Sequence, residues 1–188
     1  MNRLLSKEFF NRSTVIVAQE LLGKRLVREY HGKRLSGIII ETEAYQSDDP
    51  ACHAYNKQCT ARTKALFGPV GHSYVYFTYG NHFCLNIVAR DPHMPSGGVL
   101  IRALFPEEGI EEMKKARQKD AIHQLTSGPG KLTQALHITR EQEHIDITKR
   151  GQLYIEEGIK ISPADIDATP RIGISRATEK LWRFMVKS

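Results

Sequence analysis

The chain has 188 residues, of which 40% are hydrophobic and 26% charged, and this composition excludes a disordered, collagen-like or disulfide-scaffold protein. Its formal charge of +6 and its pI of about 9.3 favour polyanionic partners, nucleic acid first among them, because a basic surface attracts polyanions. No signal peptide is visible, and no apolar run approaches the roughly eighteen residues of a membrane helix. We therefore expect a soluble intracellular protein, located in the cytoplasm at the nucleoid if the source is bacterial.

The first half of the chain predicts one helix followed by hairpins. Ser13 is a suitable N-cap for a helix with apolar residues at helical spacing, and Gly23 is a suitable stop. Strands are expected at 24–30 and 35–43 around a His31-Gly32-Lys33 turn, and at 73–78 and 83–89 around a Tyr79-Gly80-Asn81 turn. Residues 46–70 are expected to be irregular, apart from a short helix at 63–67.

The second half predicts a mixture of short strands and helices. A strand at 98–104 is followed by a helix that begins at Pro106-Glu107-Glu108, since a proline and two acids suit a helix N-terminus. Another helix begins near Pro129, and short strands are expected at 153–155, 171–174 and 182–186. Because helices and hairpins do not alternate regularly, we predict an α+β fold with a mainly antiparallel, curved sheet and flanking helices. No repeat or linker divides the chain, so one domain, 1–188, is expected.

The cysteines and histidines do not form a recognisable metal motif. Three cysteines without a CxxC pair are typical of free thiols in a reducing compartment. Cys52, His53 and Cys59 come nearest to a zinc-ligand cluster, but they lack the tight spacing of such a site. Eight histidines contain no HxxxH or HExxH pair. We therefore expect no metal.

Two carboxylates stand where an apolar strand runs out toward a loop. By strand alternation Glu41, Glu43 and Tyr45 point the same way. From this pattern alone, solvated acids that end a strand are favoured over the functional alternative, a general base beside an apolar wall. A glycosidase-like pair of acids is disfavoured, because side chains two apart on one strand face lie too parallel to flank a bond.

Three tyrosines fall within six residues, at Tyr74, Tyr76 and Tyr79. Aromatic cross-strand pairs in a β-strand explain them most simply. The alternative is a stacking surface for bases, with Tyr76 in its wall and Tyr79, at the turn, entering a duplex as a wedge. His53 follows Glu43 in a loop, where an isolated histidine is more often a surface residue than a functional one.

The segment Thr126-Ser127-Gly128-Pro129-Gly130-Lys131 begins a predicted helix. Backbone N–H groups at such a start, with the charge of Lys131, suit a phosphate, and we include Gly130 in that candidate site. The segment is not a Walker A loop, because Leu125 and Leu132 replace the glycine and the hydroxyl residue of that motif. An ordinary helix start explains it equally well.

These segments together resemble the alkyladenine (3-methyladenine) DNA glycosylase family. The matching stretches are IIIETEAY at 38–45, DDPACH at 48–53, YVYFTYGNHFCLN at 74–86, GVLIRALFPEEG at 98–109, SGPGKLTQAL at 127–136, and the closing RIGI and LWRFMV segments. They follow the order of the family from about residue 5 onward. The resemblance reverses the preference for solvated acids and for a purely structural aromatic strand.

The resemblance implies an α+β enzyme without metal or organic cofactor that flips a damaged purine out of double-stranded DNA. Glu43 is implied as the base that activates water, and Arg102 as the residue that holds this water and the adjacent phosphate. The matching pocket positions contain no lysine, so hydrolysis to an abasic site is expected instead of a Schiff base with strand cleavage.

The resemblance also assigns residues to the flipped base and to the duplex. Tyr45, His53 and Tyr76 correspond to the residues that sandwich the base. Asn86 corresponds to the side chain that excludes the 2-amino group of guanine, and Ala51 contributes to the shape of the pocket. Tyr79 corresponds to the residue that fills the gap left in the duplex.

The expected substrates are alkylated purines such as 3-methyladenine and 7-methylguanine, with deaminated and etheno purines as further candidates. The expected partner is double-stranded DNA that contains such lesions, bound by a monomer. The main alternative is a non-catalytic module of the same fold that binds damaged DNA. A formyltransferase-like activity is a more remote alternative.

Overall fold

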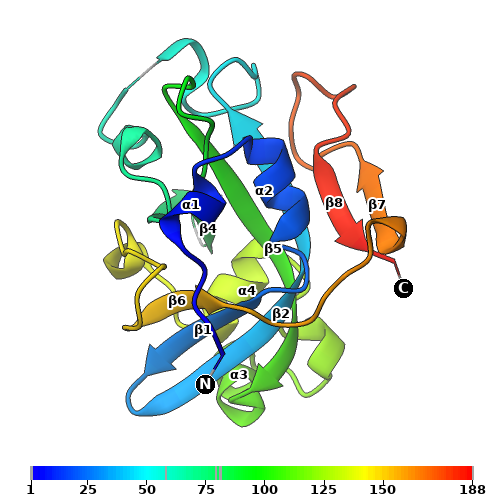
Figure 1. Cartoon of the computed structure of the whole chain (residues 1–188). Coiled ribbons are helices and arrows are strands. Elements are labelled where there is room, and N and C mark those ends of the chain that lie inside the picture. The colour runs from blue at the N-terminus through cyan, green and yellow to red at the C-terminus, as the bar shows by residue number, and fades with distance from the viewer. Residues whose placement is uncertain (1, 58, 79, 81, 188) are drawn as a thin grey trace.

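The structure, a computed structural model, describes residues 2–57, 59–78, 80 and 82–187, in which helices flank one curved sheet (Figure 1). The strands are β1 (Arg25–Tyr30), β2 (Lys33–Gln46), β3 (Ser73–Thr78), β4 (His82–Val88), β5 (Gly97–Glu108), β6 (Leu153–Glu156), β7 (Ile166–Thr169) and β8 (Arg183–Val186). The α-helices are α1 (Lys7–Phe10), α2 (Thr14–Glu20), α3 (Ile110–Arg117) and α4 (Pro129–Ala135). Short 3-10 helices are η1 (Tyr55–Lys57), η2 (Lys64–Phe67), η3 (Ile122–Gln124), η4 (Arg140–Gln142) and η5 (Pro163–Asp165).

Strand β2 organises the sheet, because it pairs with three other strands. Its partner on one edge is β5, and on the other edge β1 and β8 pair with successive parts of it. The path runs β3-β4-β5-β2-β1-β6, with β8 joined to β2 and β7 joined to β8. Every pairing between these strands is antiparallel, so the predicted α+β fold with a mainly antiparallel curved sheet is confirmed.

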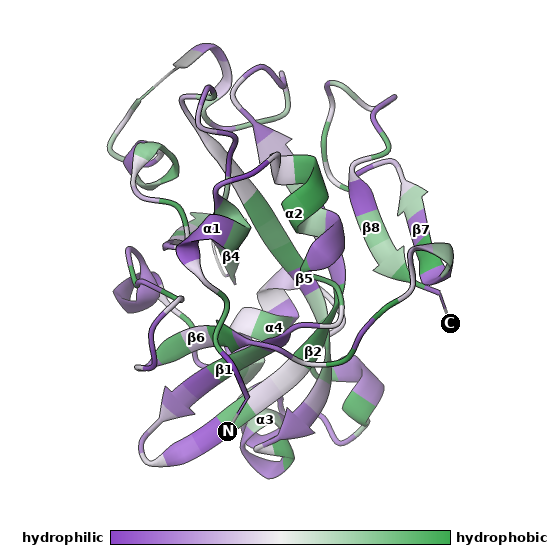
Figure 2. Cartoon of the chain, viewed as in Figure 1, coloured by the Kyte–Doolittle hydropathy of each residue, from purple (hydrophilic) through white to green (hydrophobic). Residues whose placement is uncertain are grey.

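The hydrophobic core lies between the sheet and its helices (Figure 2). Helix α2 packs on β2 and β5, helix α4 packs on β4 and β5, and α3 packs on α4. Val17 and Ala18 of α2 are fully buried, and the hydroxyl group of Thr42 on β2 donates to the carbonyl of Ala18 at 2.7 Å. Full burial of an aliphatic side chain contributes about 1.5–3 kcal/mol to the free energy of folding. The burial of Val17 and the hydrogen bond from Thr42 together fix α2 on one face of β2.

Most predicted elements are confirmed, including the helix after Ser13, the strands that became β1 to β4 and the short helix η2. Ser13 takes the N-cap position of α2, although its hydroxyl group caps no N–H in the described chain. Strand β2 continues to Gln46, so Glu43 lies inside the strand and not at its end. Tyr79 and Asn81, two residues of the predicted turn, lie outside the described residues. The extent of the domain, 1–188, stays a prediction.

The helix predicted to begin at Pro106-Glu107-Glu108 is wrong, because these residues are the end of β5. Pro106 is paired with Gly37 and Glu108 with Ser36, at a register shift that accommodates a proline without an N–H. Helix α3 begins only at Ile110, after Gly109, whose φ of 76° turns the chain out of the sheet.

Candidate active site

The sheet has the core on one face and a cavity on the other, and successive side chains of a strand point to these two faces in turn. Thr42 and Ala44 of β2 face the core, whereas Glu43 and Tyr45 face the cavity, which has a volume of about 650 Å³. The same alternation on β3, β4 and β5 directs every second side chain into the cavity. Its described lining comprises Glu43, Tyr45, Pro50, Ala51, Cys52, His53, Leu66, Tyr74, Tyr76, Thr78, Cys84, Asn86, Gly98, Leu100, Arg102, Pro129, Ile172, Gly173, Ile174, Ser175 and Arg176.

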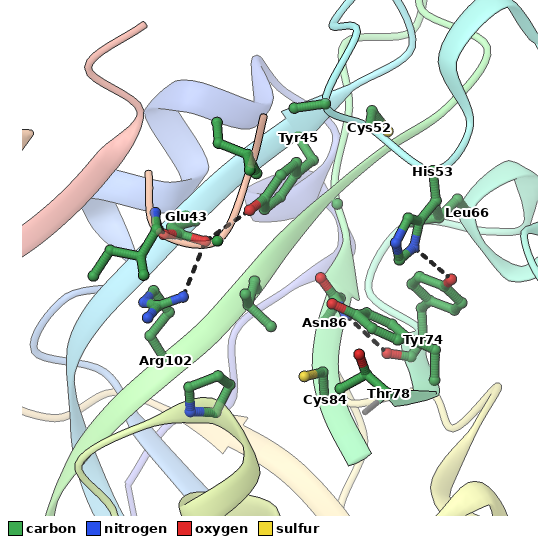
Figure 3. A pocket seen from close by; sticks show the side chains of 18 of the residues that line it. Glu43, Tyr45, Cys52, His53, Leu66, Tyr74, Thr78, Cys84, Asn86 and Arg102 are labelled. Atoms are coloured by element: carbon green, nitrogen blue, oxygen red, sulfur yellow. Dashed lines mark hydrogen bonds and ion pairs between the residues drawn. The ribbon is translucent and has the colours of Figure 1, made fainter. Parts of the chain in front are cut away.

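Glu43 is 0% exposed, accepts two hydrogen bonds and forms an ion pair with Arg102 (Figure 3). The hydroxyl group of Tyr45 donates to its Oε2 at 2.7 Å, and the Nη1 of Arg102 lies 3.2 Å from the same oxygen. The backbone N–H of Ile172 donates to Oε1 at 2.8 Å. A buried carboxylate requires such partners, since an unpaired charge in a protein interior is strongly unfavourable.

Arg102 connects the two carboxylates of β2. Its Nε donates to Oε1 of Glu41 at 2.9 Å, while Nη1 contacts Glu43. Arg183 of β8 donates to the same Glu41 oxygen at 2.6 Å and so fixes that carboxylate from the other side. Burial alone would lower the pKa of Arg102, but Glu43 and Glu41 outweigh it and raise this pKa. The guanidinium group is therefore a permanent positive charge beside Glu43.

Tyr45 has a fixed protonation state and orientation. Burial, and then the charge of Glu43, raise the pKa of Tyr45 well above its ordinary value, so the hydroxyl group stays protonated and donates. The guanidinium carbon of Arg171 lies 4.7 Å from the centroid of the Tyr45 ring. The ring is thus held between its own strand and a distant loop.

An aromatic cluster forms the opposite wall of the cavity, where Figure 3 shows His53 and Tyr74 across from Glu43 and Arg102. The ring of His53 meets that of Tyr76 edge to face at a centroid distance of 4.7 Å, and its Nδ1 lies 3.1 Å from the Tyr74 hydroxyl oxygen. The Tyr74 and Tyr76 rings are 5.4 Å apart.

The titratable groups of this wall are uncharged near neutral pH. His53 retains an exposed edge, but burial of the rest of its ring and then the charge of Arg62 lower its pKa to about 4. Burial raises the pKa of Tyr74 to about 12, and burial followed by the neighbouring Cys84 raises the pKa of Tyr76. The wall therefore presents neutral aromatic rings to the cavity.

Asn86 and its neighbours form the floor between the two walls. Asn86 is buried on β4, opposite Leu100 of β5, and its Nδ2 donates to the carbonyl of Tyr74 at 3.4 Å. Cys84, two residues earlier on the same strand, also faces the cavity. An amide held in this position offers a polar edge to any ring placed between the walls.

The structure brings most of the predicted site residues to this one cavity: Glu43, Tyr45, Ala51, His53, Tyr76, Asn86 and Arg102. Of the predicted phosphate segment, Pro129 lines the cavity. Gly130 packs closely on His82, where a Cβ atom would lie 2.9 Å from the ring, and Lys131 is exposed with its Nζ 3.3 Å from the Ser127 hydroxyl oxygen. Tyr79 lies outside the described residues, so its predicted role stays a prediction.

The strand predicted at 171–174 is wrong, because these residues form an irregular loop over the cavity. Ile172 donates its N–H to Glu43 and not to a neighbouring strand, and Gly173 has a φ of 76° that a strand does not allow. Asp49, Tyr74 and Arg171 were also missed as parts of the site. Tyr74 could have been predicted as a site residue, because it lies two residues before Tyr76 on the same strand and so faces the same side. No local sequence pattern indicates that Arg171 belongs to the site.

The described residues were predicted to hold no metal site and no membrane-spanning helix. Within the described residues, no group of three or more His, Cys, Asp or Glu side chains is placed to hold a metal ion. None of the helices in these residues is long and apolar enough to cross a bilayer. Cys52, Cys59 and Cys84 are free thiols.

Comparison with known proteins identifies close relatives over nearly the whole chain. The sequence model of the family described as Methylpurine-DNA glycosylase (MPG) matches residues 8–188. Three relatives carry the name "Putative 3-methyladenine DNA glycosylase". The one from Clostridium acetobutylicum is 47% identical, over 97% of this chain and 94% of the relative. The one from Carboxydothermus hydrogenoformans is 46% identical, over 98% of this chain and 96% of the relative. The one from Prosthecochloris aestuarii is 48% identical, over 97% of this chain and 87% of the relative.

Proposed function

The chain belongs to the methylpurine-DNA glycosylase family, and from this premise we propose that it excises alkylated purines from duplex DNA through Glu43. It is a DNA-3-methyladenine glycosylase of DNA repair, a hydrolase that acts on the N-glycosidic bond. The observation that carries the proposed mechanism is a buried Glu43 carboxylate, held by two hydrogen bonds and an ion pair, at one wall of a cavity whose opposite wall is aromatic.

Glu43 acts as the general base in this proposal. A carboxylate has about four lone-pair positions; hydrogen bonds from Tyr45 and Ile172 occupy two of them, and Arg102 forms an ion pair with Oε2. A remaining position accepts a proton from a water molecule as the water oxygen bonds to C1′ of the sugar. The bond between C1′ and the purine nitrogen breaks, and its electron pair leaves with the base. The products are a free purine and an abasic site.

The negative charge of Glu43 also stabilises the transition state. The sugar gains oxocarbenium character as the bond to the base lengthens, and a fixed carboxylate nearby offsets this positive charge. Arg102 prevents Glu43 from reorienting, and we propose that it also holds the attacking water or the adjacent phosphate. Because these groups are already held in the fold, little reorganisation is needed during the reaction.

The aromatic walls favour a damaged base that carries positive charge. We propose that the flipped purine lies between Tyr45 on one side and His53 and Tyr76 on the other. Alkylation at N3 or N7 makes the purine cationic, and each aromatic contact with a cation contributes roughly 0.5–2 kcal/mol. A neutral His53 adds no repulsion to this contact, which agrees with its lowered pKa.

Selection among purines is proposed to depend on the cavity floor. The Asn86 amide is fixed by its bond to the Tyr74 carbonyl, and we propose that it occupies the space that an exocyclic 2-amino group would need. We propose that Asn86 and Ala51 disfavour normal guanine while 3-methyladenine and 7-methylguanine are excised. Deaminated and etheno purines are neutral and depend more on the pocket for leaving-group activation.

The duplex is proposed to bind across the open side of the cavity as a complex with one monomer. The net charge of +6 favours this encounter, and Lys131 and the Gly130 N–H are proposed to contact a phosphate. Tyr79 is proposed to fill the gap that the flipped nucleotide leaves. In a bacterial cell the place of action would be the nucleoid.

The test uses duplex oligonucleotides with one lesion each, together with randomly methylated DNA. We expect release of 3-methyladenine and 7-methylguanine, measured by chromatography of the free bases, and abasic sites that yield strand breaks only after alkali. Strand breaks without alkali would contradict simple hydrolysis. Equal binding of damaged and undamaged duplex without base release would support a non-catalytic DNA-binding module instead.

A further inference from the structure

A buried ion pair stands behind the cavity, outside the residues that face it. The side chains of Asp49 and Arg171 are both 0% exposed. Arg171 donates through Nη1 to one carboxylate oxygen of Asp49 and through Nη2 to the other, the second bond measuring 3.0 Å. Such a two-pronged pair fixes both the distance and the plane of its groups.

The same guanidinium group ties together three separate segments of the chain. Its Nη1 donates to the carbonyl of Ala44 on β2 at 2.8 Å, and its Nη2 lies 3.5 Å from the carbonyl of Ala177. It also lies 4.7 Å from the centroid of the Tyr45 ring. Asp49 in turn accepts the N–H of Ala51 at 3.2 Å. Arg171 thus joins β2, the loop that leads to His53 and the loop 171–177.

Two of the three groups that bond Glu43 adjoin this pair. Ile172, whose N–H donates to Glu43, is the next residue after Arg171, and Tyr45, whose hydroxyl group donates to Glu43, is covered by the guanidinium group. We propose that the Asp49–Arg171 pair is a positioning device that holds these two donors on Glu43 and thereby sets the rate of base excision. This inference rests on the function proposed above.

Stability alone is a weak explanation for the pair. Burying two charges is expensive, and apolar residues of similar size often replace such a pair without loss of stability. The Nε of Arg171 is also buried without a partner among the described atoms, which adds to the unfavourable terms. A pair that is costly to bury but geometrically strict fits a role in orienting its neighbours.

The experiment compares variants of the pair with matched variants elsewhere in the fold. Asp49→Asn, Arg171→Lys and the apolar replacement Asp49→Val with Arg171→Met change the pair. Glu156→Gln is the control for a buried acid, since Glu156 on β6 is 1% exposed and paired with Arg25 of β1 and Arg34 of β2. Arg28→Lys is the control for a buried arginine, since Arg28 is 6% exposed and bonds to Gln152.

Each variant is measured for the single-turnover excision rate with enzyme in excess, the Kd for a duplex with a stable abasic-site analogue, and the Tm. The backbone amide resonance of Ile172 is followed by NMR in the free protein, with Glu43→Ala as the reference for loss of its side-chain acceptor. We expect the pair variants to lower the rate about 10- to 100-fold with Kd changed less than about threefold, because small displacements of catalytic groups are costly. The Ile172 resonance should move toward its position in Glu43→Ala. Arg171→Lys should retain more activity than the apolar double variant, because it keeps a positive charge opposite Asp49.

Three results would overturn the proposal: wild-type rates in the pair variants, parallel changes in rate and Kd, or equal rate losses in the control variants at equal loss of Tm. If the wild-type protein releases no base, the proposed function fails, but the NMR measurement still decides the inference. An Ile172 resonance unchanged by Asp49→Asn would then show that the pair does not hold the donor on Glu43.

Discussion

Replacing Glu43 with glutamine separates chemistry from binding more sharply than any other change in this site. The substitution keeps the shape of the side chain but exchanges one acceptor oxygen for an NH2 group. That group would face either the Ile172 N–H or the donors from Tyr45 and Arg102, so two donors would point at each other. It also removes the charge that Arg102 neutralises and the lone pair that is proposed to accept the proton of the attacking water.

The expected magnitudes differ for rate, binding and stability. General base catalysis contributes about 10²- to 10⁴-fold, and the excision rate of Glu43→Gln should fall by at least that factor. The unpaired donor should lower the free energy of unfolding by about 1–3 kcal/mol. Binding of damaged duplex should change by less than about threefold, which corresponds to less than about 0.7 kcal/mol. Glu43 lies at one wall of the cavity, across from the aromatic rings of His53 and Tyr76 that are proposed to hold the base.

Single-turnover excision from a methylated duplex, fluorescence anisotropy with the same duplex and thermal unfolding measure these three quantities. Glu156→Gln is the matched control, because it too neutralises a buried, arginine-paired acid, and it should lower Tm while excising at the wild-type rate. Wild-type excision by Glu43→Gln would refute water activation by this residue. Loss of binding in parallel with the rate would show that Glu43 supports the pocket and not the chemistry.

Three further outcomes are expected. In an NMR titration, one histidine should have a midpoint near pH 4, and its signal should be absent from His53→Gln. Because an unfolded histidine takes up its proton near pH 6.5, the folding stability that His53 contributes is complete above pH 6.5 and declines as the pH falls toward 4. A midpoint of 6–7 would contradict the packing of His53 described here. Asn86→Ala should raise guanine release relative to 3-methyladenine release, measured on one methylated duplex, and an unchanged ratio would exclude Asn86 as a selector. Gly109→Ala should lower the free energy of unfolding by about 2–4 kcal/mol, since a Cβ atom would lie 2.2 Å from a Leu35 methyl carbon at a φ of +76°. Gly32→Ala is the control, because Gly32 has a φ of +74° and no described atom lies within 4 Å of the added carbon. It should lower the free energy of unfolding, measured by chemical denaturation for both variants, by only about 1–2 kcal/mol. Equal losses in the two variants would mean that the clash at Gly109 relaxes.

Strand alternation made much of the site predictable. The period of two along β2 placed Glu41, Glu43 and Tyr45 on one side, and Arg102 does contact both acids from the neighbouring strand. The apolar alternation around Tyr76 likewise gave strand bounds that agree with β3. The alternation rule succeeds here because every second residue of these strands is buried in the core. This burial fixes the register of the strands, so the residues in between must face the cavity.

Contacts between distant segments were beyond such rules. Glu43 looked like a solvated strand-end acid, but it is buried by a loop 129 residues away in the chain. That loop has β-branched residues on either side of Gly173 and was therefore predicted as a strand, whereas tertiary bonds to Glu43 and Asp49 determine its actual shape. Pro106 shows the reverse case: a proline followed by acids suits a helix start, but pairing with β2 prevails.

The pairing of β8 with β2 has a consequence for biosynthesis. Residues 41–43 of β2 are bonded to residues 183–185 of β8, and the N–H that orients Glu43 belongs to Ile172. While a ribosome is still translating the segment after α4, the emerging polypeptide already contains Glu43, Tyr45 and Arg102 but not the loop and strand that bury them. On the mechanism proposed above, base-cleaving capacity should therefore arise late in synthesis, after the loop that holds Ile172 and strand β8 have joined β2.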